Sequence, residues 1–93
     1  MYDRIVKRMR ERVLSQGYIV TLHARREMNV DGLSIYDLEQ GVLTGNVVER
    51  QKDRTTGEWK YRVRGESMGG NAMELVAKFS LTGKLVIITV YLL

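Results

Sequence analysis

Three cations recur at every second position of one short segment, residues 57–66 (GEWKYRVRGE). Successive side chains of a β-strand point to opposite faces, so a strand here places Lys60, Arg62 and Arg64 in one row. The side chains between them are aromatic or apolar and point the other way. Because cations in a row on a rigid strand can bind an anion, the segment predicts an anionic partner.

Composition narrows the class of protein. The chain has 93 residues, of which 44 % are hydrophobic and 28 % are charged, with no proline and no cysteine. These values are typical of one ordinary globular domain, which we expect to cover residues 1–93. The lack of cysteine excludes disulfides, thiol catalysis and cysteine-ligated zinc. No apolar stretch has the length of a signal peptide or a membrane span, so we expect a cytoplasmic protein with no membrane partner.

The net charge of +4 is unevenly distributed along the chain. Residues 1–27 hold seven Lys/Arg against three Asp/Glu, and residues 50–64 hold six against two, whereas residues 28–49 hold none against four. Two basic blocks of this kind fit an electrostatic footprint for nucleic acid or for an acidic protein. The alternative is that surface cations only keep a small domain in solution.

Hydrophobic periodicity predicts helices first and strands afterwards. Apolar residues recur every four positions over residues 3–16, a second helix fills residues 22–30, and a third runs from a capping box at Ser34 to Gly45. Residues 18–22 form either a brief strand or an extended lead-in to the second helix. After residue 45 the period changes to two. Strands are expected at residues 46–52, 58–66, 72–80 and 84–92.

This order of elements predicts an α+β fold, with two or three N-terminal helices packed on one face of a four-stranded, mainly antiparallel sheet. One face of the middle hairpin then turns toward the helices, and its side chains are Trp59, Tyr61 and Val63. On the open face we expect Lys60, Arg62 and Arg64. Further cations on other strands are candidates to join that row, namely Arg50, Lys52 and Lys78. The sequence therefore predicts a basic open sheet face.

Several short motifs, in this order and spacing, resemble one bacterial family. They are H-A-R-R-E-M at 23–28, Asp31, S-I-Y-D-L-E at 34–39, L-T-G at 43–45, K-Y-x-V-x-G at 60–65 and V-I-I-T-V-Y at 86–91. Over about residues 18–92 the chain resembles the family named domain of unknown function 4258. That family is similar to the RelE/ParE-type toxins, which share a barnase-like sheet platform with several ribonucleases. The resemblance implies a RelE/ParE-like fold, RNA as substrate, and a cognate antitoxin as partner.

Ribonucleases of that broad class direct the 2′-hydroxyl of RNA at the adjacent phosphate. The reaction needs a base for the hydroxyl, cations for the developing charge and an acid for the leaving oxygen. We assign His23, Lys60 and Tyr91 as candidate catalytic residues. His23 lies at an expected helix start, which disfavours positive charge, so its neutral ring would be available as a base. The candidate substrate-binding residues are Arg50, Tyr61, Arg62 and Arg64.

Each of these residues also has a structural interpretation. His23 is explained as a packing or capping residue, the cation row as a solvated strand face or a charged edge, and both Tyr61 and Tyr91 as core. One histidine among scattered acids offers no ligand spacing for zinc, and no glycine-rich loop precedes a helix. No metal or cofactor is therefore expected.

Two functions of different classes follow. The first is a toxin-like ribonuclease or translation inhibitor that acts on RNA without a metal ion. The second is a non-catalytic module that binds nucleic acid or an acidic protein, with binding that weakens as salt rises and with no cleavage. A homodimer is left open in both cases.

Overall fold

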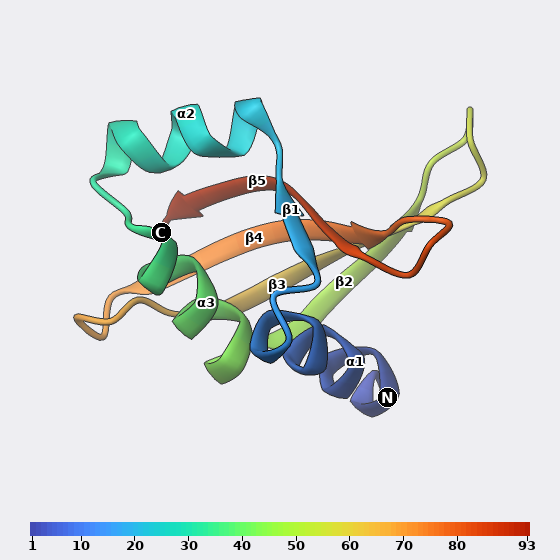
Figure 1. Cartoon of the computed structure of the whole chain (residues 1–93), viewed down its shortest axis with the longest axis horizontal. Helices are drawn as coiled ribbons and strands as arrows, with labels where there is room; N and C mark the ends of the chain where they lie inside the picture. Colours follow the sequence, from blue (N-terminus) through green and yellow to red (C-terminus); the bar gives the residue numbers. More distant parts are fainter.

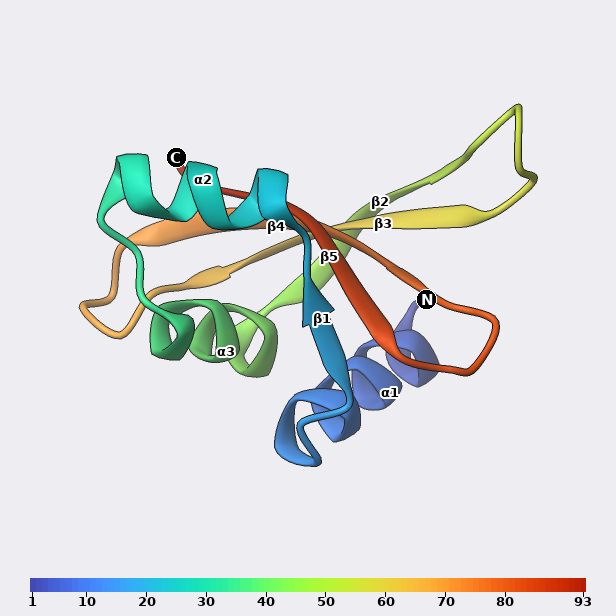
Figure 2. The same cartoon turned by 45° about the horizontal axis from the view of Figure 1, so that its top comes forward.

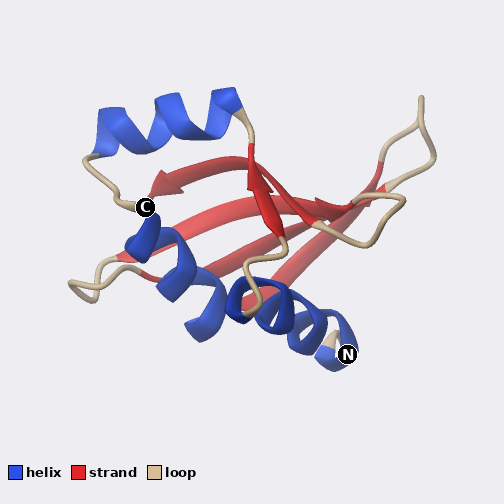
Figure 3. Ribbon diagram, in the orientation of Figure 1, coloured by secondary structure: helices blue, strands red, loops and turns tan.

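Three helices and a short strand precede a run of four longer strands, as the change of hydrophobic period indicates (Figure 1). The computed structural model describes residues 1–93. Figure 3 separates the helices from the strands by colour. The elements are α1 (Asp3–Leu14), β1 (Tyr18–Val20), α2 (Leu22–Asp31), α3 (Ile35–Thr44), β2 (Asn46–Lys52), β3 (Trp59–Glu66), β4 (Ala72–Phe79) and β5 (Leu85–Leu92).

The five strands form one mixed sheet in the order β1-β5-β4-β3-β2. Strands β2 to β5 form an antiparallel meander, and β1 pairs in parallel with the start of β5, with Tyr18 beside Leu85 and Val20 beside Ile87. The predicted α+β fold is confirmed, but the predicted number of four strands is wrong. A three-residue strand is too short to show a period, and its partner lies far along the chain, so the local sequence did not decide between a strand and a lead-in.

Helices α1 and α3 cover one face of the sheet, while the other face is left open (Figures 1 and 2). Their apolar sides carry Met9 and Val13 from α1 and Leu38 and Val42 from α3, all of which are buried. They join a core of sixteen buried hydrophobic residues with the inward side chains of the strands. Helix α2 adds Ala24 and Met28 to the same core from its place along β5.

Helix α2 lies along the edge of β5, beyond the point where β1 ends (Figure 2). Glu27 and Asp31 accept hydrogen bonds from the backbone N–H groups of Val90 and Leu92, at 3.2 and 2.9 Å. Edge N–H groups that lack a partner strand need other acceptors. Two carboxylates spaced one helical turn apart therefore take the place of a neighbouring strand.

The start of α3 is fixed by the predicted capping box. The Ser34 hydroxyl accepts a hydrogen bond from the Asp37 N–H, and the Asp37 carboxylate accepts one from the Ser34 N–H. The same carboxylate accepts a bond from the N–H of Met68, in the β3–β4 turn, at 2.9 Å. These backbone N–H groups hold the pKa of Asp37 below its usual range. One side chain thus caps α3 and fastens it to the sheet.

Close packing of α3 on β3 depends on glycine. A Cβ atom added at Gly65 would lie 2.1 Å from the carbonyl oxygen of Gly41 and 3.0 Å from Oγ1 of Thr44. The first distance is too short for any side chain, so the backbones of α3 and β3 approach as closely as they do only because residue 65 has none.

We predict that Gly65→Ala lowers the free energy of unfolding by about 3 kcal/mol, because the added methyl group fits only if α3 moves away from β3. Urea denaturation followed by circular dichroism measures the change. Gly69→Ala is the matched control, since a Cβ there would meet nothing closer than 3.6 Å. Equal midpoints for the two variants would contradict this account of the packing.

Candidate functional site

The cation row lies on the open sheet face. Tyr61 and Val63 point toward the helices, with 7 % and 2 % of their surface exposed. Lys60, Arg62 and Arg64 alternate with them along β3 and so point to the other side. The predicted orientation of the row is confirmed. Tyr61, a candidate substrate-binding residue, is instead part of the core, where its ring meets Phe79 edge-on.

Glu74 lies at the centre of this face, opposite Arg64 in the β3–β4 pairing. Its Oε2 accepts hydrogen bonds from Nη1 of Arg62 and Nε of Arg64, each at 2.9 Å, and Nη2 of Arg64 lies 2.7 Å away. Its Oε1 accepts a bond from the Tyr91 hydroxyl at 2.6 Å. The Glu74 side chain is 3 % exposed, whereas those of Arg62 and Arg64 are 33 % and 54 % exposed. A nearly buried anion therefore holds two accessible guanidinium groups.

The hydrogen bonds of the cluster determine the protonation states of Glu74 and Tyr91. The hydrogen bond from Tyr91, together with the bond from Arg64 and the charges of both arginines, lowers the pKa of Glu74 despite its burial. The hydrogen bond to Glu74, the burial of the ring and the carboxylate charge raise the pKa of Tyr91. Near neutral pH Glu74 is ionised and Tyr91 is protonated, so the tyrosine acts as a donor.

Every cation of the row has a carboxylate partner. Besides the pairs with Glu74, the open face has contacts of Arg62 with Glu49, Lys60 with Asp53 and Lys78 with Glu58, at 3.5, 3.1 and 2.7 Å. Cations and carboxylates are therefore balanced, and the prediction of a strongly basic open face is wrong. Alternation along one strand places charges on a face, but it does not show which acids the neighbouring strands bring to the same face.

Arg50, a candidate substrate-binding residue, lies on the opposite face from Arg62. The register of β2 against β3 shifts between Val47 and Glu49, so that Arg50 pairs with Tyr61. Its guanidinium lies over the ring of Trp59, 4.2 Å from the centroid. The sequence analysis expected Arg50 on the open face, and this prediction is wrong. Strict alternation would have placed the residue there, but the bulge moves it to the other face.

His23 begins the first turn of α2, where the sequence analysis placed it, and 70 % of its side chain is exposed. Its Nε2 lies 3.2 Å from Oε1 of Glu27, so this nitrogen acts as a donor rather than as a free base. Glu27 also accepts hydrogen bonds from the Thr89 hydroxyl and the Val90 N–H. Thr89 lies two residues before Tyr91 on β5 and so points to the same face, which places Glu27 near the Glu74 cluster. His23 is thus at the border of that cluster.

Two acidic residues of this region were not among the predicted site residues. Glu74 was visible only as one polar position of a half-polar strand, although registering β3 against β4 across their short turn would have placed it opposite Arg64. Glu27 could have been found from its spacing of four residues to His23 on a helix. Lys60, by contrast, is held by Asp53 near the end of the β2–β3 hairpin and makes no contact with Glu74.

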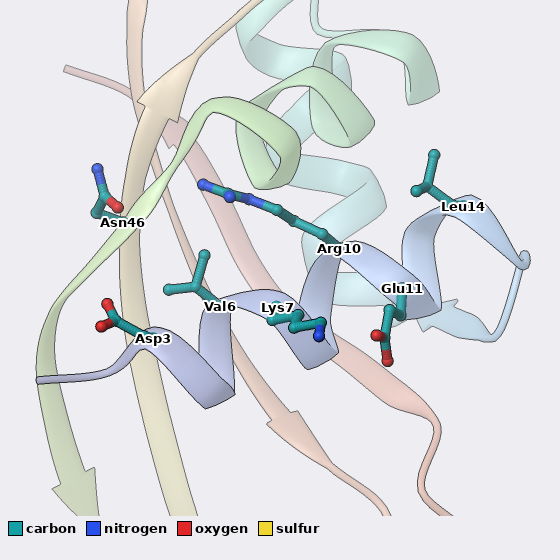
Figure 4. Close-up of a pocket in the computed structure, with 7 residues that line it drawn as sticks. All are labelled: Asp3, Val6, Lys7, Arg10, Glu11, Leu14 and Asn46. Atoms are coloured by element: carbon teal, nitrogen blue, oxygen red, sulfur yellow. The ribbon is translucent and has the colours of Figure 1, made fainter.

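Surface hollows do not coincide with the Glu74 cluster. A small one of about 90 Å³ lies beside it and includes Arg62 and Val76. The largest, of about 370 Å³, lies between α1 and the start of β2 (Figure 4). There Arg10 extends from α1 and donates a hydrogen bond to the carbonyl of Gly45 at 3.2 Å. Its Nε is buried without a partner. We place the candidate site on the open face, because only there do charged groups converge on one buried carboxylate.

The structure contains no group of three or more His, Cys, Asp or Glu residues that could hold a metal ion. None of its helices combines the length and the apolar composition needed to cross a membrane.

The fold and the site define an α+β protein with a charged cluster on the open face of a mixed sheet. The chain belongs to the family described as domain of unknown function (DUF4258), whose model matches residues 20–92. This match includes α2, the four long strands and every residue of the Glu74 cluster, and it leaves out α1. No curated protein and no solved structure matches the chain. The family resemblance is confirmed, and the likeness to RelE/ParE-type toxins stays a prediction.

The lowered pKa of Glu74 makes stability depend on pH. Its folded-state pKa lies below the usual 4.5, so ionised Glu74 stabilises the fold above that pH, and this stability is lost as the pH falls through the folded-state pKa. We predict that Glu74→Gln lowers the free energy of unfolding near neutral pH by about 2 kcal/mol, because hydrogen bonds to a charged group are lost.

The same variant should lose less stability than the wild type on acidification from about pH 6 to pH 3, which urea denaturation at each pH measures. Asp37 and Asp53, whose pKa values are also lowered, contribute equally to both proteins. Parallel stability curves for the two proteins would show that Glu74 does not have the state assigned to it.

Proposed function

We propose that this protein is a toxin-like ribonuclease of RelE/ParE-like fold. It cleaves RNA on its open sheet face without a metal ion, and a cognate antitoxin protein keeps it inactive. The observation that carries the proposal is the convergence of two accessible guanidiniums and one tyrosine hydroxyl on the buried carboxylate of Glu74.

Arg62 and Arg64 are suited to a phosphodiester. Each guanidinium has five N–H donors and contacts carboxylates through only two of its nitrogens, so further donors remain for phosphate oxygens. Glu74 fixes both groups in place, and a fixed guanidinium loses little freedom when it binds. The two cations stabilise the negative charge that develops when the 2′-hydroxyl attacks phosphorus.

Glu74 is assigned as the base for that hydroxyl. In the free protein its pKa is low, and its oxygens are engaged by the arginines and by Tyr91. A phosphate on the remaining N–H groups of Arg62 and Arg64 brings a second negative charge close to the carboxylate, which raises the pKa of Glu74 and its strength as a base. RNA itself thus activates the group that accepts the 2′-hydroxyl proton.

The leaving oxygen requires an acid. His23 is the only imidazole of the chain, and Glu27 holds its Nε2 at the border of the cluster, so we assign the proton donor to His23. When the phosphate binds, the protonated Tyr91 hydroxyl donates its hydrogen bond to a phosphate oxygen instead of to Glu74, and so orients the phosphate. In this reaction the bond from phosphorus to the 5′-oxygen breaks, and the products are a 2′,3′-cyclic phosphate and a free 5′-hydroxyl.

The toxin role and the RelE/ParE-like fold are supported by the family resemblance and by the arrangement of the helices on the sheet. The chain belongs to the family described as domain of unknown function (DUF4258), which is similar to the RelE/ParE-type toxins. A sheet with helices on one face and an open second face is compatible with the barnase-like platform of those toxins. The cognate antitoxin follows from the same resemblance.

A second candidate function is a module that binds RNA through Arg62 and Arg64 without cleaving it. One observation favours it, since Glu74, the carboxylate at the centre of the cluster, is already bound by three side chains in the free protein. The two functions differ in what happens to bound RNA.

We predict that the purified protein cleaves single-stranded RNA in the presence of EDTA and leaves 2′,3′-cyclic phosphate ends. Glu74→Gln should slow cleavage by at least about 100-fold, because the base is lost. Arg64→Gln should slow it by about 100-fold, because a charge-stabilising donor is lost. Gel electrophoresis of end-labelled RNA measures the rates.

Lys84→Gln is the matched control, because it removes one exposed cation from the β4–β5 turn, outside the cluster, and it should cleave as fast as the wild type. RNA that stays intact with the wild type would refute the nuclease and, if it is bound, support the binding module. A Glu74→Gln variant that is folded and cleaves at the wild-type rate would remove Glu74 from the mechanism.

We predict that induced expression of the wild-type chain arrests bacterial growth and that expression of Glu74→Gln to the same level does not. The comparison follows from the assigned base, without which cellular RNA is spared. Culture density and the integrity of total RNA are measured together. Growth arrest by both proteins would point to an effect that does not require cleavage.

A further inference from the structure

The tip of the β2–β3 hairpin projects beyond the rest of the molecule (Figures 1 and 2). We call residues 50–60 the hairpin arm. The arm carries Trp59, the only tryptophan of the chain, and 39 % of its surface is exposed. Trp59 pairs with Lys52 across the two strands and lies on the same face as Tyr61, opposite to the face of Arg62. The largest aromatic side chain of the protein thus stands partly in solvent, away from the Glu74 cluster.

Cations surround this ring. The guanidinium of Arg50 lies over it at 4.2 Å from the centroid, and Nζ of Lys52 lies 5.8 Å from the centroid. The turn of the arm adds Arg54, which borders a hollow of about 280 Å³ at the tip together with Lys52, Lys60 and the carboxylate Asp53. The arginine over the tryptophan brings an aromatic and a cationic surface together at one point of the arm.

The acids of the arm do not neutralise these cations. Asp53 is engaged by Lys60 at 3.1 Å, and Glu58 is engaged by Lys78 at 2.7 Å. None of the ion pairs in the structure includes Arg50, Lys52 or Arg54. In contrast to the open face, this face of the arm therefore carries uncompensated positive charge.

We propose that this face of the hairpin arm binds single-stranded nucleic acid. A nucleobase stacks on the surface formed by Trp59 and Arg50, and neighbouring phosphates contact Lys52 and Arg54. The ligand must be both anionic and flat, and a single strand offers phosphates and unpaired base faces together. A duplex offers the charge but hides the faces of its bases. This site lies on the other face of the sheet from Glu74 and does not rest on the proposed cleavage.

The test uses a short oligodeoxyadenosine strand, which has no 2′-hydroxyl and so cannot be cleaved by the proposed reaction. Its binding should quench the fluorescence of Trp59, because the base stacks on the indole. Affinity is measured separately by the anisotropy of a fluorescein-labelled strand. Trp59→Ala should weaken binding about tenfold, and Arg50→Gln should weaken it severalfold and make it less dependent on salt.

Lys84→Gln again provides the control for loss of one exposed cation, and it should change the affinity less than about twofold. The proposal is overturned if the strand does not quench Trp59, if Trp59→Ala binds as tightly as the wild type, or if a DNA duplex or polyglutamate binds as well as the single strand. Trp59 is the only tryptophan of the chain, so its quenching reports binding at the arm alone, and a failure of the cleavage mechanism leaves this result unchanged.

Discussion

The open face of the sheet depends on the burial of one ionised carboxylate. Glu74 on β4 is nearly inaccessible to water, and a charge in that position is tolerated only when it is paired and hydrogen-bonded. Its partners come from both neighbouring strands, Arg62 and Arg64 from β3 and Tyr91 from β5. No helix covers this face, so a polar network linking three strands provides there the cohesion that apolar packing against α1 and α3 provides on the other face.

The same network limits how strongly the open face can attract and bind an anion. On the open face Arg62 and Arg64 are held rigidly, but their charge is offset by Glu74 and Glu49. Long-range attraction to this face is therefore weak, and binding there depends on short contacts of fixed geometry. The uncompensated cations lie on the hairpin arm instead, around Trp59. The unpaired cations that can attract an anion over a distance thus lie on one face of the β2–β3 hairpin. The rigid guanidiniums that can position it lie on the other face.

Local periodicity was sufficient to predict the helices, the four long strands and the outward direction of Arg62 and Arg64, because these depend only on near neighbours in the sequence. The failures all involve the pairing of one strand with another, which the period of a single segment does not show. One bulged residue beside Val47 reversed the face of Arg50, and β1 was undecided because only its contact with β5 makes it a strand. Glu74 was missed because its importance appears only when β3 and β4 are set in register.

Helix α2 shows why the edge and the face of this sheet cannot be considered separately. Its carboxylates Glu27 and Asp31 bind the N–H groups of Val90 and Leu92, the two residues that flank Tyr91. The helix therefore fixes the backbone on both sides of the tyrosine whose hydroxyl reaches Glu74 on the open face. Glu27 also holds His23, so one side chain at the sheet edge links the imidazole to the end of β5. A displacement of α2 would move His23 and Tyr91 together, and through Tyr91 it would change the hydrogen bonding and the pKa of Glu74.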